Sequence, residues 1–255
     1  MKTDTTSTEK FSGKADIYSK YRPAYPKKIT EYISTFITDP RSTIADIGAG
    51  TGIFTKCLCY LGCNIICVEP NTDMLMKAAE NLCNYEKVTF VRSPAEDTML
   101  AENSVDLVTA AQAFHWFDAE KFRDECRRIL KPNGKIMLLW NTIENGSELV
   151  SQINDISSRY CEDFHTRKGL NTPLNKSSEV LRNFFTEFDT MIFRNDLQYD
   201  MQGFIGNRLS RSYSPKESDE NYEPYVKELK MLFDKHSADG KITVPNVTEC
   251  YIGSV

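Results

Sequence analysis

The chain has 255 residues, which is enough for one α/β domain with an elaboration or for two small domains. Its formal net charge of −5 provides no general attraction to nucleic-acid phosphates or to anionic membranes, so we expect neither as a partner. The first ten residues are polar and charged, and no apolar run reaches about 18 residues. The sequence therefore predicts neither a signal peptide nor a membrane span.

Eight cysteines are spread along the chain without the spacing of a zinc site. Only Cys57, Cys59, Cys63 and Cys67 lie close together, and they lack paired C-x-x-C motifs. We therefore expect buried, reduced thiols and no bound metal, a pattern that favours a cytoplasmic protein.

The N-terminal part is predicted to be an arm followed by a helix. About 12 residues without apolar periodicity are expected to be disordered. The segment from Tyr18 to Pro26 then combines aromatic residues with two prolines and precedes a helix predicted from Lys28 to Phe36. Because these prolines favour an extended backbone, we expect the segment to lie across another part of the molecule.

A strand followed by closely spaced glycines comes next. The apolar run from Ile44 to Ile47 predicts a buried parallel strand, and it leads directly into Gly48, Gly50 and Gly52. Glycines permit a sharp turn and a close approach of the backbone to a bound molecule. Asp46, just before them, is placed to accept hydrogen bonds from loop amides or a ligand ammonium group. The stretch predicts a ligand-binding loop.

The next helix and strand suggest what the loop binds. Thr51 is expected to cap the helix and Gly62 to end it, after which residues 64–68 form a second strand that ends in Glu69. A carboxylate at that position can bind both hydroxyls of a ribose, so we expect a nucleoside-like cofactor. The NAD fingerprint requires glycine at its sixth position, where this chain has Ile53.

Further strands and helices complete five alternating units, which predict a parallel, right-handed, three-layer sandwich. The expected elements are an amphipathic helix from Met74 to Leu82, strands Lys87–Val91 and Val105–Ala111, a helix capped by Asp118 that runs to Leu130, a turn at Lys131–Gly134 and a strand Lys135–Trp140.

Beyond residue 141 the sequence predicts mainly helices, with strands at the end of the chain. The expected elements are a helix from Ser147 to His165, a break at Gly169–Pro173, a helix from Ser177 to Phe185, a strand Phe188–Phe193, helices Met201–Leu209 and Glu223–Lys235, and strands Ile242–Val244 and Thr248–Ile252. We expect the helices between the last two strands to form a substrate cap above the binding edge of the sheet.

Several motifs in this order resemble those of one enzyme family. Residues 46–52 with Glu69 resemble the first two motifs of class I S-adenosylmethionine (SAM) dependent methyltransferases. The type-11 (UbiE-like) family also has counterparts of Val68–Leu75, Ser93–Glu96, Ser104–Val108, Ala111–Phe117 and Leu130–Gly134 in the same order. The Phe-His-Trp-Phe sequence at 114–117 is similar to the trans-aconitate methyltransferase-like branch.

The resemblance implies an α/β, Rossmann-like three-layer sandwich with a seven-stranded, mostly parallel sheet and a helical cap inserted between the last two strands. Residues 1–37 would form an arm and helix over the cofactor, 38–145 the SAM-binding core, and 146–255 the rest of the sheet with the cap, all in one continuous domain. The motifs specify no oligomeric state.

The resemblance also implies a set of site residues. The residues implied to bind SAM are Tyr18, Tyr21, Arg22, Asp46, Gly48, Ala49, Gly50, Gly52, Glu69, Pro70, Met74, Ala95, Glu96 and Gln112. In this set Arg22 would pair with the methionine carboxylate, and Ala95 and Glu96 would contact the adenine edge. Phe114, His115 and Trp116 would line the reacting centre.

The predicted function is transfer of a methyl group from SAM to a small molecule, with a carboxylate favoured as acceptor by the resemblance. His115 is either a general base or a hydrogen-bonded ring that shapes the pocket. Arg208 and Arg211, which flank Tyr213, are either solvated or clamp an anionic substrate. The alternatives are an NAD-dependent oxidoreductase and a SAM-binding module without catalysis.

Overall fold

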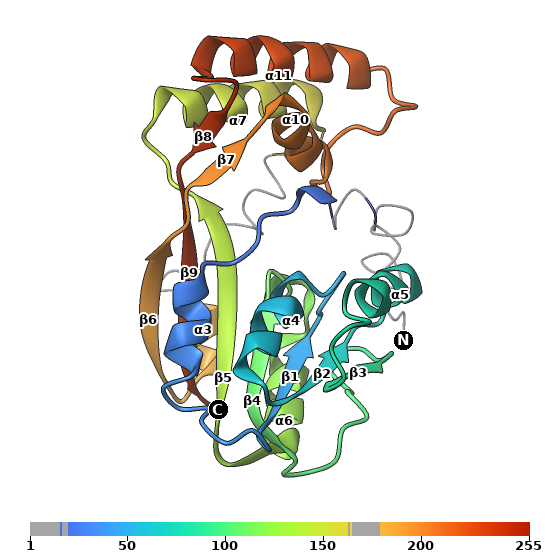
Figure 1. The fold of residues 1–255 in the computed structure, drawn as a ribbon, viewed down its shortest axis with the longest axis vertical. Helices are drawn as coiled ribbons and strands as arrows, with labels where there is room; N and C mark the ends of the chain where they lie inside the picture. Colours follow the sequence, from blue (N-terminus) through green and yellow to red (C-terminus); the bar gives the residue numbers. More distant parts are fainter. Residues whose placement is uncertain (1–15, 17–19, 163, 165–178) are drawn as a thin grey trace.

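The computed structural model describes residues 16, 20–162, 164 and 179–255. Tyr18, the expected disorder of the first residues and the expected break at Gly169–Pro173 lie outside the described residues. Figure 1 shows a sheet flanked by helices in the lower part of the molecule and a smaller group of helices above it. The N-terminal segment passes between the two parts.

The sheet has seven strands in the order β3-β2-β1-β4-β5-β9-β6. They are β1 (Thr43–Ile47), β2 (Asn64–Val68), β3 (Val88–Val91), β4 (Val105–Ala111), β5 (Leu130–Ile143), β6 (Glu187–Arg194) and β9 (Asn246–Ser254). Strands β1 to β5 pair in parallel, and β9 is antiparallel to both β5 and β6. This arrangement confirms the predicted seven-stranded, mostly parallel sheet.

Helices bury apolar side chains against both faces of the sheet. On one face lie α3 (Lys27–Ile33) and α4 (Ile53–Leu58), which is extended by the short helix η1 (Cys59–Leu61). On the other lie α6 (Ala119–Ile129) and α9 (Glu179–Phe184). Helix α5 (Thr72–Asn81) follows β2, and η2 (Phe114–Trp116) follows β4. The result is the predicted three-layer sandwich (Figure 1).

A second part of the molecule, which we call the cap, has its own apolar core. It consists of α7 (Glu148–Tyr160), α10 (Met201–Leu209), α11 (Tyr222–His236) and the two-stranded sheet of β7 (Leu197–Tyr199) and β8 (Ile242–Val244). Salt bridges join α7 to α11 at Arg159–Glu228 and Lys235–Glu148. The cap faces the carboxyl-terminal edge of the parallel strands (Figure 1).

The structure corrects three expectations about the elements. The cap includes α7, which precedes β6, and β8 pairs with the unpredicted strand β7 instead of joining the large sheet. The predicted turn at residues 131–134 does not separate α6 from β5, because β5 already begins at Leu130; the pairing with β4 skips these four residues, and Asn133 has φ +69°. Thr51 does not cap α4, because the N-cap position is Gly52 and no side chain bonds to it.

Candidate functional site

The glycine loop lies at the carboxyl end of β1, and its glycines adopt left-handed backbone angles. Gly48 has φ +67°, and a Cβ there would lie 2.6 Å from the Ala113 Cβ, so only glycine lets the loop pack this closely on the segment after β4. Gly50 has φ +57°, and a Cβ there would meet nothing within 4 Å. The loop is therefore packed on one side and open at Gly50.

Glu69 joins the end of β2 to this loop. Its carboxylate accepts a hydrogen bond from the Gly50 N–H at 2.9 Å and one from the Asn71 N–H at 2.9 Å. The Gly48 and Ala49 amides donate instead to the Val68 carbonyl, at 2.8 and 3.1 Å. Burial raises the pKa of Glu69, while the two backbone amides oppose that rise. A carboxylate is thus held at the loop, at the position predicted to bind a ribose.

Asp46 is directed away from the loop amides that it was expected to contact. It is fully buried, and its oxygens accept hydrogen bonds from the hydroxyls of Thr55 at 2.6 Å and Thr109 at 2.8 Å. Burial raises its pKa to about 6. Asp46 therefore links β1 to α4 and β4 by hydrogen bonds beneath the loop. Its effect on a bound ligand would be indirect, through the position of the loop.

The other residues predicted to bind the cofactor follow neighbouring strands. Met74, in the first turn of α5, and Ala95 are buried, at 3% and 4% exposure, whereas Pro70 is exposed. Glu96 accepts a hydrogen bond from the Asp118 N–H at 2.8 Å, which ties the segment after β3 to the start of α6. Gln112, after β4, is held at φ +58°, a strained angle for this residue type that is often found at functional sites.

Phe114, predicted to line the reacting centre, is buried in the core. It is 2% exposed, and its ring packs against Phe122, Trp140 and Phe184. His115 and Trp116 of the same segment are only partly buried, with ring centroids 5.0 Å apart. Phe114 therefore anchors η2 and leaves its two neighbours nearer the surface.

The His115 ring is oriented by Trp140, a residue that the sequence did not single out. The Trp140 Nε1–H donates a long hydrogen bond, 3.4 Å, to His115 Nδ1. Burial, together with the positive charge of Arg22, lowers the pKa of His115 to about 4. The ring is therefore neutral near pH 7, and because Nδ1 accepts the indole bond, its proton is on Nε2.

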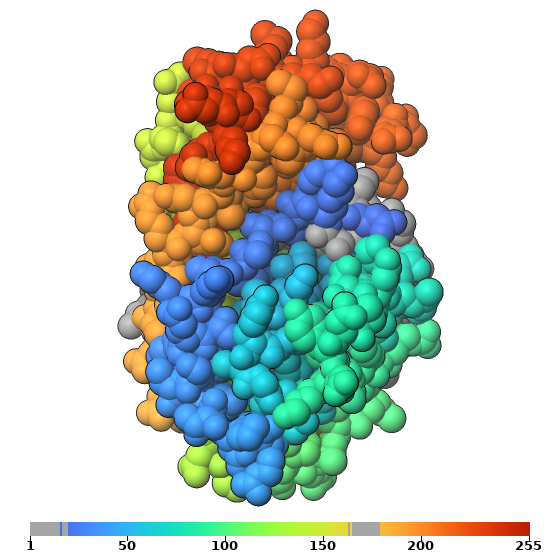
Figure 2. All heavy atoms as spheres, in the orientation of Figure 1, coloured from blue at the N-terminus to red at the C-terminus, as the bar shows by residue number. Residues whose placement is uncertain are grey.

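The N-terminal arm is attached to the cap. The Asn207 side chain donates to the Tyr21 carbonyl at 2.9 Å, and Arg22 Nη2 donates to the Ser210 carbonyl at 3.1 Å. A Cβ on Gly206 would lie 2.5 Å from the Tyr21 ring, so this ring rests directly on α10. Figure 2 shows the arm crossing the boundary between the sheet part and the cap. Arg22 is thereby held between α10 and His115.

Arg208 is buried in the cap, so the first of its two predicted alternatives, a solvated side chain, is wrong. It is 3% exposed, and its guanidinium donates a hydrogen bond to Asn207 Oδ1. Arg211 is partly buried, and its charge helps to lower the pKa of Arg208, so the two guanidinium groups lie near each other. Burial is the larger cause and brings this pKa to about 10.

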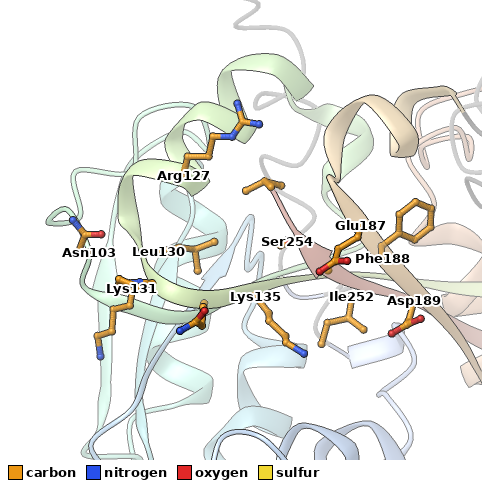
Figure 3. Close-up of a pocket in the computed structure, with 15 residues that line it drawn as sticks. Asn103, Arg127, Leu130, Lys131, Lys135, Glu187, Phe188, Asp189, Ile252 and Ser254 are labelled. Carbon is orange, nitrogen blue, oxygen red and sulfur yellow. The ribbon is translucent and has the colours of Figure 1, made fainter.

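A hollow of about 830 Å³ lies at the opposite edge of the sheet, among the amino-terminal ends of β5 and β6. Figure 3 shows charged side chains of both signs around it, including Lys131, Lys135, Glu187 and Asp189. None of the residues lining it is a predicted site residue, and the glycine loop is at the other edge. It is therefore separate from the candidate site.

Cysteines and possible metal ligands do not form a site in the described part of the chain. All eight cysteines are unpaired, and burial raises the pKa of most of their thiols. No group of three or more His, Cys, Asp or Glu side chains among the described residues is placed to hold a metal ion. The same residues contain no helix with the length and apolarity needed to cross a bilayer.

Comparison with known proteins gives matches to methyltransferases. The family model described as "Methyltransferase domain" matches residues 45–138. A methyltransferase-like protein of Schizosaccharomyces pombe, otherwise uncharacterized, is 38% identical over 57% of this chain and 57% of its own length, so the chain spans less than two thirds of that relative. A second uncharacterized methyltransferase of S. pombe is 32% identical over 79% of this chain and 78% of its own.

A solved structure shares the fold. A protein described as a type II methyltransferase from Anaeromyxobacter dehalogenans superposes with a TM-score of 0.64 and 20% identity, over 92% of this chain and 98% of that one. The sheet order, the glycine loop after β1 and the acid after β2 define a class I, Rossmann-like methyltransferase architecture.

The 32% identity over more than three quarters of a named methyltransferase shows that this chain belongs to the SAM-dependent methyltransferase family. Its cofactor is SAM, and the alternative of an NAD-dependent oxidoreductase is excluded. The residues present fit this cofactor, because the open side of Gly50 adjoins a held carboxylate at the end of the neighbouring strand.

Proposed function

We propose that this protein transfers the methyl group of SAM to a small-molecule acceptor between the carboxyl edge of the sheet and the cap. The observation that carries the proposal is the glycine loop of β1, which is open at Gly50 and joined there to the Glu69 carboxylate. In this proposal residues 38–145 bind the cofactor, 1–37 cover it, and 146–255 complete the sheet and supply the acceptor-binding cap.

Each group of residues at this edge has one task in binding the cofactor. The open side of Gly50 accommodates the amino-acid tail, and the Glu69 carboxylate accepts hydrogen bonds from the ribose hydroxyls. Ala95 and Glu96, after β3, contact the adenine edge. When bound, SAM supplies a methyl group already activated by the sulfonium charge, so the protein has mainly to align the acceptor and exclude water.

The state of His115 favours a carboxylate oxygen as the acceptor. With Nδ1 accepting from Trp140, the ring offers an N–H donor at Nε2 and no free basic nitrogen. A carboxylate is ionised at neutral pH, needs no base and can accept this hydrogen bond. A hydroxyl or amine acceptor would instead require a nitrogen that takes up a proton. We therefore assign His115 to positioning of the acceptor.

Two finer assignments are also proposals. The Phe-His-Trp-Phe segment supports membership of the trans-aconitate methyltransferase-like branch, where η2 presents His115 and Trp116 at the site. The unpaired cysteines support work in a reducing compartment such as the cytoplasm.

Two assays test the proposal. Calorimetric titration with S-adenosylhomocysteine should show one site per chain. Labelled SAM with a panel of carboxylic acids and phenols should then give label transfer to acids, as methyl esters that mild base hydrolyses. Transfer to phenols alone would contradict the assigned acceptor. Cofactor binding without turnover on the whole panel would favour a SAM-binding module without catalysis.

A further inference from the structure

The cap contains positive charge for which the described residues supply no compensating acid. Arg208 is 3% exposed, yet no carboxylate among the described residues lies within ion-pairing distance of Arg208 or Arg211. The Nε atoms of both arginines are buried and find no hydrogen-bond partner among the described residues. Buried charges in proteins are normally paired, because removing an ion from water is costly. Within the part of the chain that the structure describes, no anion therefore balances this pair of guanidinium groups.

A tyrosine hydroxyl lies near these two arginines. The Tyr199 hydroxyl, on β7, is buried and has no hydrogen-bond partner among the described residues. Burial raises its pKa, while the positive charges of Arg208, Arg211 and Arg22 oppose the rise, so all three guanidinium groups lie near this hydroxyl. The cluster thus includes three buried donors, Arg208 Nε, Arg211 Nε and the Tyr199 hydroxyl, that have no acceptor among the described residues.

The cluster is placed next to the candidate site. Arg22 is bonded to the Ser210 carbonyl just after α10, and its charge also acts on His115. Arg22 therefore links the cluster to His115, because its charge acts on Tyr199 as well as on this ring. A molecule held by the cluster would extend toward His115 and the glycine loop.

We propose, on the basis of the function proposed above, that Arg208, Arg211 and Tyr199 bind an oxyanion group of the acceptor molecule, a carboxylate or a phosphate, that is separate from the atom methylated. The substrate class is then a small acid that keeps one negative charge in the methylated product.

Electrostatics explains why this anion is not the reacting group. Methylation of a carboxylate removes its negative charge, so an ion pair with buried arginines would be stronger in the ground state than in the transition state. Such contacts hold the substrate but oppose the chemical step. Contacts to a remote anion keep their full strength throughout the reaction and position the acceptor without this penalty.

The first test measures anion binding to the whole protein saturated with S-adenosylhomocysteine, with succinate and inorganic phosphate as probes at fixed ionic strength. We expect one of them to bind to the wild type and to bind about tenfold more weakly to Arg211→Gln and a few-fold more weakly to Tyr199→Phe. Lys216→Gln, which removes an exposed charge from the same region, should bind like the wild type. If only succinate binds, the oxyanion group of the acceptor molecule is a carboxylate. If only phosphate binds, it is a phosphate.

The second test separates this role from a structural one. In anion-free buffer Arg208→Met should unfold at a temperature equal to or above that of the wild type, because it removes an uncompensated buried charge. It should also lose the rise in melting temperature that the bound probe gives the wild type. A structural arginine would instead lower the melting temperature when replaced.

The proposal is overturned if neither probe binds to the wild type, or if Arg211→Gln binds both probes as the wild type does. A destabilised Arg208→Met that keeps the probe-induced rise would also overturn it. The cofactor proposal is judged separately, because S-adenosylhomocysteine binding should be unchanged in all these variants. If the wild type does not bind S-adenosylhomocysteine, the cofactor proposal is contradicted, and the same anion titrations on the protein without it decide the anion proposal.

Discussion

The two sides of the candidate site are built in different ways. On the sheet side, the groups proposed to bind the amino-acid tail and ribose are backbone amides, a glycine and one carboxylate within residues 46–71, joined by hydrogen bonds within the protein. On the cap side, the proposed binding groups are long side chains from segments far apart in sequence, and the buried Arg208 has no counter-ion among the described residues. The groups proposed to bind the cofactor tail and ribose thus come from one short stretch of sequence, whereas the proposed acceptor site is assembled only by the tertiary structure.

The largest expected effect is on the sheet side, at Gly48. In Gly48→Ala the new Cβ would lie 2.6 Å from the Ala113 Cβ, in a backbone with φ +67°. We expect S-adenosylhomocysteine to bind on the order of a few hundredfold more weakly, because steric strain and the left-handed angle together cost about 2–5 kcal/mol.

Gly62→Ala is the matched control for that change. Gly62 has a similar φ of +70°, but a Cβ there would meet nothing within 4 Å. It should lower the melting temperature slightly and leave cofactor affinity unchanged, as measured by calorimetry. Equal losses of affinity in the two variants would show that packing of the loop on Ala113 is not what the cofactor requires.

The next effect concerns Glu69. Glu69→Gln keeps the size of the side chain but removes the charge that holds the Gly50 and Asn71 amides. Hydrogen bonds to charged groups contribute about 1.5–3 kcal/mol, so we expect the dissociation constant for S-adenosylhomocysteine to rise about a hundredfold. The exposed Glu80→Gln on α5 serves as control and should bind normally. Wild-type affinity in Glu69→Gln would contradict a ribose-binding role.

A smaller effect is expected where the two sides meet, at His115. Its pKa is lowered to about 4 by burial and by Arg22, so the ring loses its proton near that pH and stays neutral as the pH rises. With a carboxylate acceptor, kcat/KM should therefore not rise or fall through titration of His115 between about pH 5.5 and 8.5.

His115→Ala should lower kcat/KM about tenfold through loss of one hydrogen bond, without changing the shape of this pH profile. A limb near pH 6–7 in the wild type that disappears in the variant would instead identify His115 as a general base.

The smallest effect tests the independence of the two sides. Arg159→Gln removes the exposed ion pair with Glu228 that joins α7 to α11. Exposed pairs contribute about 0–1 kcal/mol, so we expect a melting temperature lowered by a few degrees at most and unchanged cofactor affinity. A large loss of cofactor affinity in this variant would show that the sheet side depends on the cap.

Sequence reasoning succeeded where structure depends on short stretches of chain. The runs Asn64–Val68, Val105–Ala111 and Met201–Leu209 form a strand, a strand and a helix with the predicted bounds. Their periodicity and flanking residues carry this information locally. The position of Glu69 beside the glycine loop followed in the same way, because adjacent parallel strands end at one edge of the sheet.

The remaining features depend on distant contacts. Strand β7 has three residues, and its partner β8 lies more than 40 residues further on, so no periodicity could reveal it. The role of Trp140 depends on where η2 places the His115 ring. The burial of Arg208 has no local signal at all, because an arginine on a helix is usually solvated.

One measurement tests the central claim that cofactor and acceptor are held by separate sides of the site. Calorimetric titration of S-adenosylhomocysteine into the wild type, Glu69→Gln and Arg211→Gln should give one site per chain in the wild type, greatly weakened binding in Glu69→Gln and wild-type binding in Arg211→Gln. No heat in the wild type, or equal losses in both variants, would contradict it.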